Sequence, residues 1–334
     1  TYRGHHEQNM ALTGIAYARA KRRQQIFVAT SSTGPGSTNM VTAAAVAMSN
    51  RIPILFLPGD TYANRMPDPV LQQVEHFNNP GITQNDAFKP VTKYFDRLTR
   101  PEQILQTLPQ AIQTMLDPAD CGPACISMSQ DVQGEVFEYP EDFFKEIVHN
   151  IRRPRPDDFQ IKQAAEKIKS SKHPIIISGG GVFYSDAMED IANFAEKHNI
   201  PVTQTVMGYS TIKRDHSHFL GPIGGLGGKA ANNLAKQTDL AIAVGTKLGD
   251  FTTGSWANFE NPNFSLVSIN VARFDASKHM AQSVIGDAKV SLNELSQALG
   301  NWKASDEWHK KSRDELKSWN EYVDKESGPT NQKL

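Results

Sequence analysis

The fold class of this 334-residue chain is decided by the stretch Ile26-Phe27-Val28-Ala29-Thr30-Ser31-Ser32-Thr33-Gly34-Pro35-Gly36-Ser37-Thr38-Asn39. Residues 26–29 are apolar and run into turn residues, which predicts a short buried strand. Residues 37–50 predict a helix, whose N-terminus offers free N–H groups to a ligand that the glycines allow close to the backbone. The stretch has neither the ending of a P-loop nor Gly-x-Gly-x-x-Gly spacing. It predicts either a ligand-binding loop or a plain strand-to-helix turn.

The same alternation continues on both sides of this stretch. Further strands are predicted at 52–57 and 124–128, and helices at 8–23 and 101–116. A charged, Pro-rich break at 152–158 follows, after which the pattern restarts with strands at 175–178, 201–203, 240–244 and 266–269 and helices at 186–198 and 305–325. Strands that alternate with helices predict parallel sheets. We expect an α/β protein of two Rossmann-like, three-layer units.

Composition excludes several classes of protein. Lys and Arg number 35 and Asp and Glu number 36, so a net charge of −1 lacks the basic surplus of a nucleic-acid binder. No apolar run approaches the roughly 20 residues of a membrane span. Two cysteines, Cys121 and Cys125, are too few for a disulfide framework and indicate a reducing compartment. We therefore expect a cytoplasmic protein that binds neither nucleic acid nor membrane.

A second segment that carries chemistry is Gly4-His5-His6-Glu7-Gln8-Asn9-Met10-Ala11. A zinc-binding His-Glu-x-x-His helix is excluded, because its last position is occupied by Met10. Glu7 is then either a functional carboxylate or an acid that complements the dipole of a helix start.

The two segments together resemble a known family. Glu7-Gln8-x-x-Ala11, Gly34-Pro35-Gly36-x-Thr38-Asn39 and Pro58-Gly59-Asp60 resemble the pyrimidine-binding domain of thiamine-diphosphate enzymes of the acetolactate synthase type. The second half resembles their central domain, at residues 174–181, 200–202, 207–208, 239–245 and 269–271. Other stretches resemble the cyclic 1,2-dione hydrolases of myo-inositol breakdown within that family, at 67–75, 85–89, 100–103, 117–120, 130–135 and 250–253.

The resemblance implies three domain segments: a pyrimidine-binding domain at 1–153 without its N-terminal part, a central Rossmann-like domain at 154–300, and a helix and linker at 301–334. It implies that Glu7 is catalytic and bonds N1′ of the cofactor's aminopyrimidine, which promotes loss of the thiazolium C2 proton. The cofactor's pyrimidine would pack against Pro35, Gly36 and Asn39.

The activity implied is cleavage of a C–C bond in a trihydroxycyclohexane-1,2-dione, with water releasing a ring-opened product, 5-deoxy-glucuronate. The substrate contacts implied for this polyol dione are Asp60, Gln73, Lys89 and Lys93, each of which could equally be a surface polar residue. His5 and His6 are proton carriers or, as an equal alternative, capping and packing residues.

Members of the family hold the diphosphate through Mg²⁺ in a third domain marked by Gly-Asp-Gly. The Gly-Asp pairs of this chain, at 59–60, 249–250 and 286–287, are not followed by Gly. The resemblance thus implies no metal site in this chain, which looks like a piece lacking that domain and is expected to be inactive alone. The family places the cofactor between subunits, which implies a homodimer or homotetramer.

Three alternatives stay open. An acetolactate-synthase-like carboligase could hold FAD along 221–228 and 245–249. Segment 221–228 is expected to be a mobile loop or a helix N-terminus. A nucleotide-binding module for NAD or FAD could use Gly179-Gly180-Gly181, although a triple glycine after a strand is more often a tight turn. A scaffold without catalysis is the third, and the presence of Glu7 argues against it.

Overall fold

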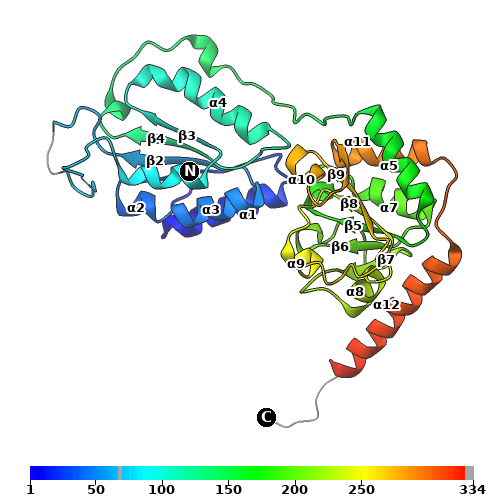
Figure 1. The fold of residues 1–334 in the computed structure, drawn as a ribbon. Helices are drawn as coiled ribbons and strands as arrows, with labels where there is room; N and C mark the ends of the chain where they lie inside the picture. The colour runs from blue at the N-terminus through cyan, green and yellow to red at the C-terminus, as the bar shows by residue number, and fades with distance from the viewer. Residues whose placement is uncertain (67–69, 75, 328–334) are drawn as a thin grey trace, which may run out of the picture. The chain divides into compact units, whose positions relative to one another are not determined.

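The computed structural model describes residues 1–66, 70–74 and 76–327. The chain divides into two compact units, residues 1–152 and 153–334, which are described separately (Figure 1). The division falls in the charged, Pro-rich stretch, where residues 145–157 form no helix or strand.

The first unit is built on a four-stranded sheet of order β1-β2-β4-β3, in which every pair of neighbours is parallel. Its strands are β1 (Val28–Ser31), β2 (Leu55–Asp60), β3 (Tyr94–Leu98) and β4 (Ala124–Ser129). Its helices are α1 (Glu7–Ala20), α2 (Pro35–Thr38), α3 (Val41–Asn50) and α4 (Ile104–Leu116), with 3₁₀ turns η1 (Gln84–Val91), η2 (Pro101–Gln103), η3 (Val132–Gly134) and η4 (Glu141–Phe144).

The two faces of this sheet are covered by different helices. Alternate β2 residues point to opposite sides, so Phe56 packs with alanines of α1 and α3 while Leu55 packs with Ala111 and Met115 of α4. The result is a three-layer unit. All carboxyl ends of the strands lie at one edge, since Ser31 is aligned with Pro58 and Asp60 with Ser129.

The second unit is built on a six-stranded parallel sheet of order β10-β9-β8-β5-β6-β7. Its strands are β5 (Pro174–Ser178), β6 (Val202–Gln204), β7 (Phe219–Pro222), β8 (Leu240–Val244), β9 (Ser265–Asn270) and β10 (Gln282–Ile285). Its helices are α5 (Asp158–Ser170), α6 (Gly180–Tyr184), α7 (Met188–His198), α8 (Lys229–Ala235), α9 (Asp250–Thr253), α10 (Arg273–Ser277), α11 (Ala288–Leu299) and α12 (Asp306–Glu326), with the 3₁₀ turn η5 (Val206–Gly208).

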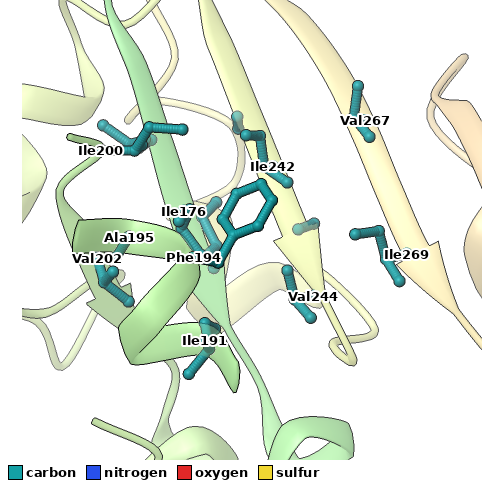
Figure 2. Close-up of a cluster of buried hydrophobic side chains, with 14 of the residues drawn as sticks. Ile176, Ile191, Phe194, Ala195, Ile200, Val202, Ile242, Val244, Val267 and Ile269 are labelled. Atoms are coloured by element: carbon teal, nitrogen blue, oxygen red, sulfur yellow. The ribbon is translucent and has the colours of Figure 1, made fainter. Parts of the chain in front are cut away.

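One part of the core of the second unit lies between its sheet and helix α7, and helices α5, α8, α11 and α12 contribute other side chains to it. Figure 2 shows Phe194 of α7 beside Ile176 and Ile242 of the central strands, and all three are at most 2% exposed. Each such side chain stabilises the fold by about 2 kcal/mol through burial. Within the described residues, no helix is both long enough and apolar enough to cross a bilayer.

The structure confirms the predicted class, α/β with two parallel sheets, and corrects several elements. The helix predicted at 37–50 is interrupted at Asn39 and Met40, which separate α2 from α3. Strands β3, β7 and β10 were not predicted. Segment 221–228 begins in the last residues of β7 and ends at Gly228, the N-cap of α8, as the helix-start interpretation predicted.

Candidate active site

Glu7 and Asn39 meet at the carboxyl edge of the first sheet. Glu7 occupies the first turn of α1, and Asn39 lies where α2 ends, after the turn that follows β1. The amide Nδ2 of Asn39 donates a hydrogen bond of 2.8 Å to Oε2 of Glu7. This bond joins residues that are 32 positions apart in sequence.

Gly36 forms the wall next to the other oxygen of Glu7. A Cβ added at Gly36 would lie 3.5 Å from Glu7 Oε1 and 2.7 Å from the Ser32 hydroxyl. Pro35 begins α2 at the first helical position, where a fixed φ favours the helix start. The structure therefore brings Glu7, Pro35, Gly36 and Asn39 to one place, with a glycine-lined face against the carboxylate.

The turn itself requires glycine at position 34. Gly34 has φ of 69°, and a Cβ there would lie 1.7 Å from the carbonyl oxygen of Gln72. The segment 70–74 thus rests directly on the turn. From the other side, Gln84 donates to Thr33 Oγ1 (2.7 Å) and Asn85 to the Gly59 carbonyl (2.9 Å). Sequence reasoning gave these two amides no role, because only the fold places η1 beneath the turn.

The surroundings of Glu7 favour its charged form. The hydrogen bond from Asn39 lowers the pKa of Glu7 below its usual value, and a bond from its own backbone N–H and the nearby His6 act in the same direction. Desolvation opposes these effects and is outweighed. Glu7 is therefore a carboxylate at neutral pH, able to accept a hydrogen bond or a proton.

The histidines beside Glu7 differ in role. His6 caps helix α1, because its Nδ1 accepts the backbone N–H of Asn9 at 3.4 Å, and its Nε2 lies 3.4 Å from the Asn39 amide. His5 is exposed. The geometry gives His6 the capping role that was one of its two predicted alternatives.

Asp60 is held in a buried network behind the same sheet edge. Its side chain is fully buried, bonds Arg97 Nε at 2.7 Å, accepts from the Ser127 hydroxyl, and accepts the Thr61 N–H at 2.8 Å. Arg97 continues to Thr83 and Asp86. Arg97 was missed from sequence, and the one available signal was a charged residue within a strand.

The other predicted substrate contacts are scattered. Nε2 of Gln73, from the segment against the turn, is buried without a hydrogen-bond partner in the described part of the chain. Lys89 pairs with Asp86 at 2.9 Å and is more than half exposed. Lys93 pairs with Asp120 just before β3, at the amino edge of the sheet, about 16 Å of strand away from the edge that holds Glu7.

In the second unit, the triple glycine serves backbone packing. A Cβ at Gly179 would lie 2.5 Å from the Gly245 carbonyl oxygen, and the Gly181 N–H donates to that oxygen at 2.8 Å. These loops follow β5 and β8, between which the strand order reverses. Open α/β sheets bind dinucleotides at such a reversal. Here the two loop backbones are in contact with each other at that point, which supports the tight-turn interpretation.

No group of three His, Cys, Asp or Glu side chains suited to a metal ion occurs among the residues with a described position.

Two segments of the chain match models of known protein families. Residues 161–295 match the model of the thiamine pyrophosphate enzyme central domain, and residues 1–79 match that of the thiamine pyrophosphate enzyme N-terminal TPP binding domain. Thiamine pyrophosphate is another name for thiamine diphosphate.

Several curated relatives bear the name 3D-(3,5/4)-trihydroxycyclohexane-1,2-dione hydrolase. The protein of Clostridium perfringens strain 13 is 50% identical over 298 residues, which cover 89% of this chain and 47% of that protein. That of Clostridium tetani is 46% identical over 337 residues (98% and 52%), and that of Geobacillus thermodenitrificans is 48% identical over 301 (90% and 47%). The chain spans about half the length of the curated relatives that it matches.

Proposed function

Since the chain belongs to the thiamine pyrophosphate enzymes, with sequences of their N-terminal and central domains, we propose that it is part of a thiamine-diphosphate-dependent hydrolase of a cyclic 1,2-dione. The reaction is hydrolytic cleavage of a ring C–C bond in trihydroxycyclohexane-1,2-dione, giving 5-deoxy-glucuronate in myo-inositol breakdown. The names and identities of the relatives support this substrate over the pyruvate of a carboligase.

The observation that carries the proposal is the pairing of Glu7 with Asn39 beside Gly36. The fit to a flat aminopyrimidine is supported by the glycine: Gly36 places no side chain next to Glu7 Oε1, and a Cβ there would lie 3.5 Å from that oxygen. A carboxylate with a lowered pKa is the form that can hold a ring N–H or accept its proton. The residues present therefore fit the cofactor's pyrimidine.

Thiamine diphosphate, when bound, supplies a nucleophilic carbon and an electron sink for C–C cleavage. The contribution of this chain is to hold and orient that group. Glu7 provides the hydrogen-bond acceptor, and Pro35, Gly36 and Asn39 provide the wall against which the ring would pack. Asp60 and Arg97 support the strand ends beneath them.

We assign the first substrate contact to Gln73, because its amide nitrogen is buried beside the turn with a donor to offer. A polyol dione presents hydroxyl and carbonyl oxygens that accept such a donor. Contacts from Asp60, Lys89 and Lys93 remain predictions, and Asp60 is already engaged by three internal partners.

Mg²⁺, a homodimer or homotetramer, and a cytoplasmic location are further parts of this proposal, supported by the family resemblance. Glu7 alone does not offer the set of oxygen ligands that Mg²⁺ requires, so the ion would bind away from this carboxylate. Light scattering of the full-length protein tests the assembly, and a monomeric active enzyme would contradict it.

The decisive experiment compares Glu7→Gln with Glu102→Gln in the full-length enzyme loaded with thiamine diphosphate and Mg²⁺. Glutamine keeps the shape of Glu7 but cannot accept a proton, so kcat for the dione falls by about 10²–10⁴-fold. Glu102 is also a helix-start glutamate with a lowered pKa, at an exposed site paired with Arg100, and its variant keeps wild-type kcat. Undiminished turnover in Glu7→Gln would refute the proposal.

A further inference from the structure

We propose that Asn39 is a positioning residue that acts through Glu7: its amide selects which carboxylate oxygen is engaged and keeps the group charged. The inference rests on the proposed function for its consequence in catalysis. It goes beyond a place for Asn39 in the wall against which the cofactor packs, because it assigns the side chain a partner within the protein and a measurable effect on that partner.

The hydrogen bond from Asn39 gives the two oxygens of Glu7 different surroundings. Oε2 receives the N–H of Asn39 at 2.8 Å, whereas Oε1 lies on the side of Gly36. A carboxylate held at one oxygen loses the rotation that would otherwise exchange the two. Hydrogen bonds to a charged acceptor are also about twice as strong as neutral ones, so this contact orients the group and is the largest of the effects that favour its charged form.

The backbone holds Asn39 rigidly for this purpose. Its N–H bonds the Pro35 carbonyl at 3.1 Å, and it stands at the junction where α2 ends and α3 begins after Met40. Asn39 (φ −62°, ψ −22°) and Met40 (φ −86°, ψ −12°) both keep helical dihedrals. The direction of the Asn39 side chain is therefore set by the helical course of the backbone at the end of α2.

His6 does not compete for this role. Because a carboxylate only accepts, Asn39 must present its nitrogen to Glu7, and the same nitrogen then lies 3.4 Å from His6 Nε2. A neutral imidazole has one accepting nitrogen, so His6 cannot accept from both Asn9 and Asn39. Both His6 contacts measure 3.4 Å, and the shorter bond to Glu7 fixes the amide.

The test uses Asn39→Ala and Asn39→Asp in the full-length protein, with Asn50→Ala as control, since Asn50 bonds Val46 of its own helix and the neighbouring Ser49. The pKa of Glu7 is read from the NMR shift of its ¹³C-labelled carboxyl group without added cofactor. We expect it to rise in Asn39→Ala, to rise further in Asn39→Asp, where a second carboxylate faces Glu7, and to stay unchanged in Asn50→Ala.

Asn39→Asp raises the pKa of Glu7 by charge repulsion in any case, so Asn39→Ala is the variant that decides between a hydrogen-bonding and a merely steric role. An unchanged pKa of Glu7 in Asn39→Ala would overturn the inference. In the loaded enzyme the acidic limb of the kcat profile moves to higher pH in the same order, and kcat at neutral pH falls about tenfold or more in Asn39→Asp. If the pKa of Glu7 moves but Glu7→Gln stays fully active, the proposed function fails and the positioning role stands. If Glu7→Gln loses activity but the pKa of Glu7 does not move, the positioning role fails and the proposed function stands.

Discussion

His218 should make the second unit sensitive to acid. Its side chain is buried between β7 and α12, where its Nε2 lies 3.2 Å from the Asn199 side-chain oxygen and its Nδ1 lies 2.9 Å from the Ser217 hydroxyl. Its ring stacks on His309 of α12 with 4.2 Å between ring centroids. A protonated ring here would be desolvated and would face other basic groups.

Burial, with smaller effects of His309, His216 and Arg313, lowers the pKa of His218 to about 4. The unfolded chain binds the proton near pH 6.5. Stability is therefore complete above pH 6.5 and is lost as the pH falls from there towards 4, because only the unfolded state takes up the proton. Between pH 7.5 and 4.5 the loss from this residue is about 2–3 kcal/mol, a large part of the 5–15 kcal/mol typical of a domain.

Urea unfolding followed by tryptophan fluorescence measures this directly, because all four tryptophans (256, 302, 308 and 319) belong to the second unit. We expect His218→Gln to lower stability at pH 7.5 but to lose about 2–3 kcal/mol less than wild type on acidification to pH 4.5. His198, whose pKa is also lowered by burial, titrates in both proteins and cancels in the difference. The exposed His149→Gln serves as control, and parallel pH dependences of wild type and His218→Gln would refute the reasoning.

Two further substitutions test the frame of the first unit. Arg97→Ala should lower the free energy of unfolding by about 3–5 kcal/mol, because it leaves the buried Asp60 carboxylate without its charged partner. The thermal midpoint is followed by circular dichroism, and its restoration on adding Asp60→Asn would identify the lost pairing as the cause. An unshifted midpoint in Arg97→Ala would contradict this prediction. Gly34→Ala would place a side chain at φ of 69° and 1.7 Å from the Gln72 carbonyl oxygen. We therefore expect it to displace segment 70–74 and to make that segment more sensitive to limited proteolysis. Gly134→Ala is the control, because no atom lies within 4 Å of its added Cβ, and it should leave the cleavage rate unchanged.

Local patterns predicted the sheets and the turn because their causes are local. Apolar runs ended by glycine and proline predicted most strands of both units, whereas a common site for Glu7 and Asn39 was implied only by the family resemblance. Strand β3 (Tyr94-Phe95-Asp96-Arg97-Leu98) was not predicted, because two charged residues interrupt its apolar run. One of them, Arg97, pairs with the buried Asp60 of β2. The interruption of the helix at Asn39 was not predicted either, because no proline or other strong helix-breaking residue marks it in the sequence.

The contacts that sequence could not supply are those in which a residue serves a partner far along the chain. The family resemblance implied that Asp60 is a substrate contact, and the structure shows that Arg97 and Ser127 already bond its carboxylate. Lys93 stands near polar motifs in sequence but at the opposite edge of the sheet from Glu7. A strand five residues long separates its two ends by about 16 Å, so closeness in sequence predicts little about closeness at a sheet edge.

The two units put glycine at their strand ends to different uses, and the difference bears on function. In the second unit, Gly179 and Gly181 bring one loop against Gly245, and the two backbones fill the reversal point of the sheet themselves. In the first unit, Gly36 faces a side-chain carboxylate held by an amide, so the space left by the missing Cβ borders a charged acceptor. Glycine next to backbone stabilises a loop, whereas glycine next to Glu7 leaves room for a flat molecule at a group that can bind its N–H. On this ground we expect the first unit, not the glycine-rich turn of the second, to bind the cofactor's ring.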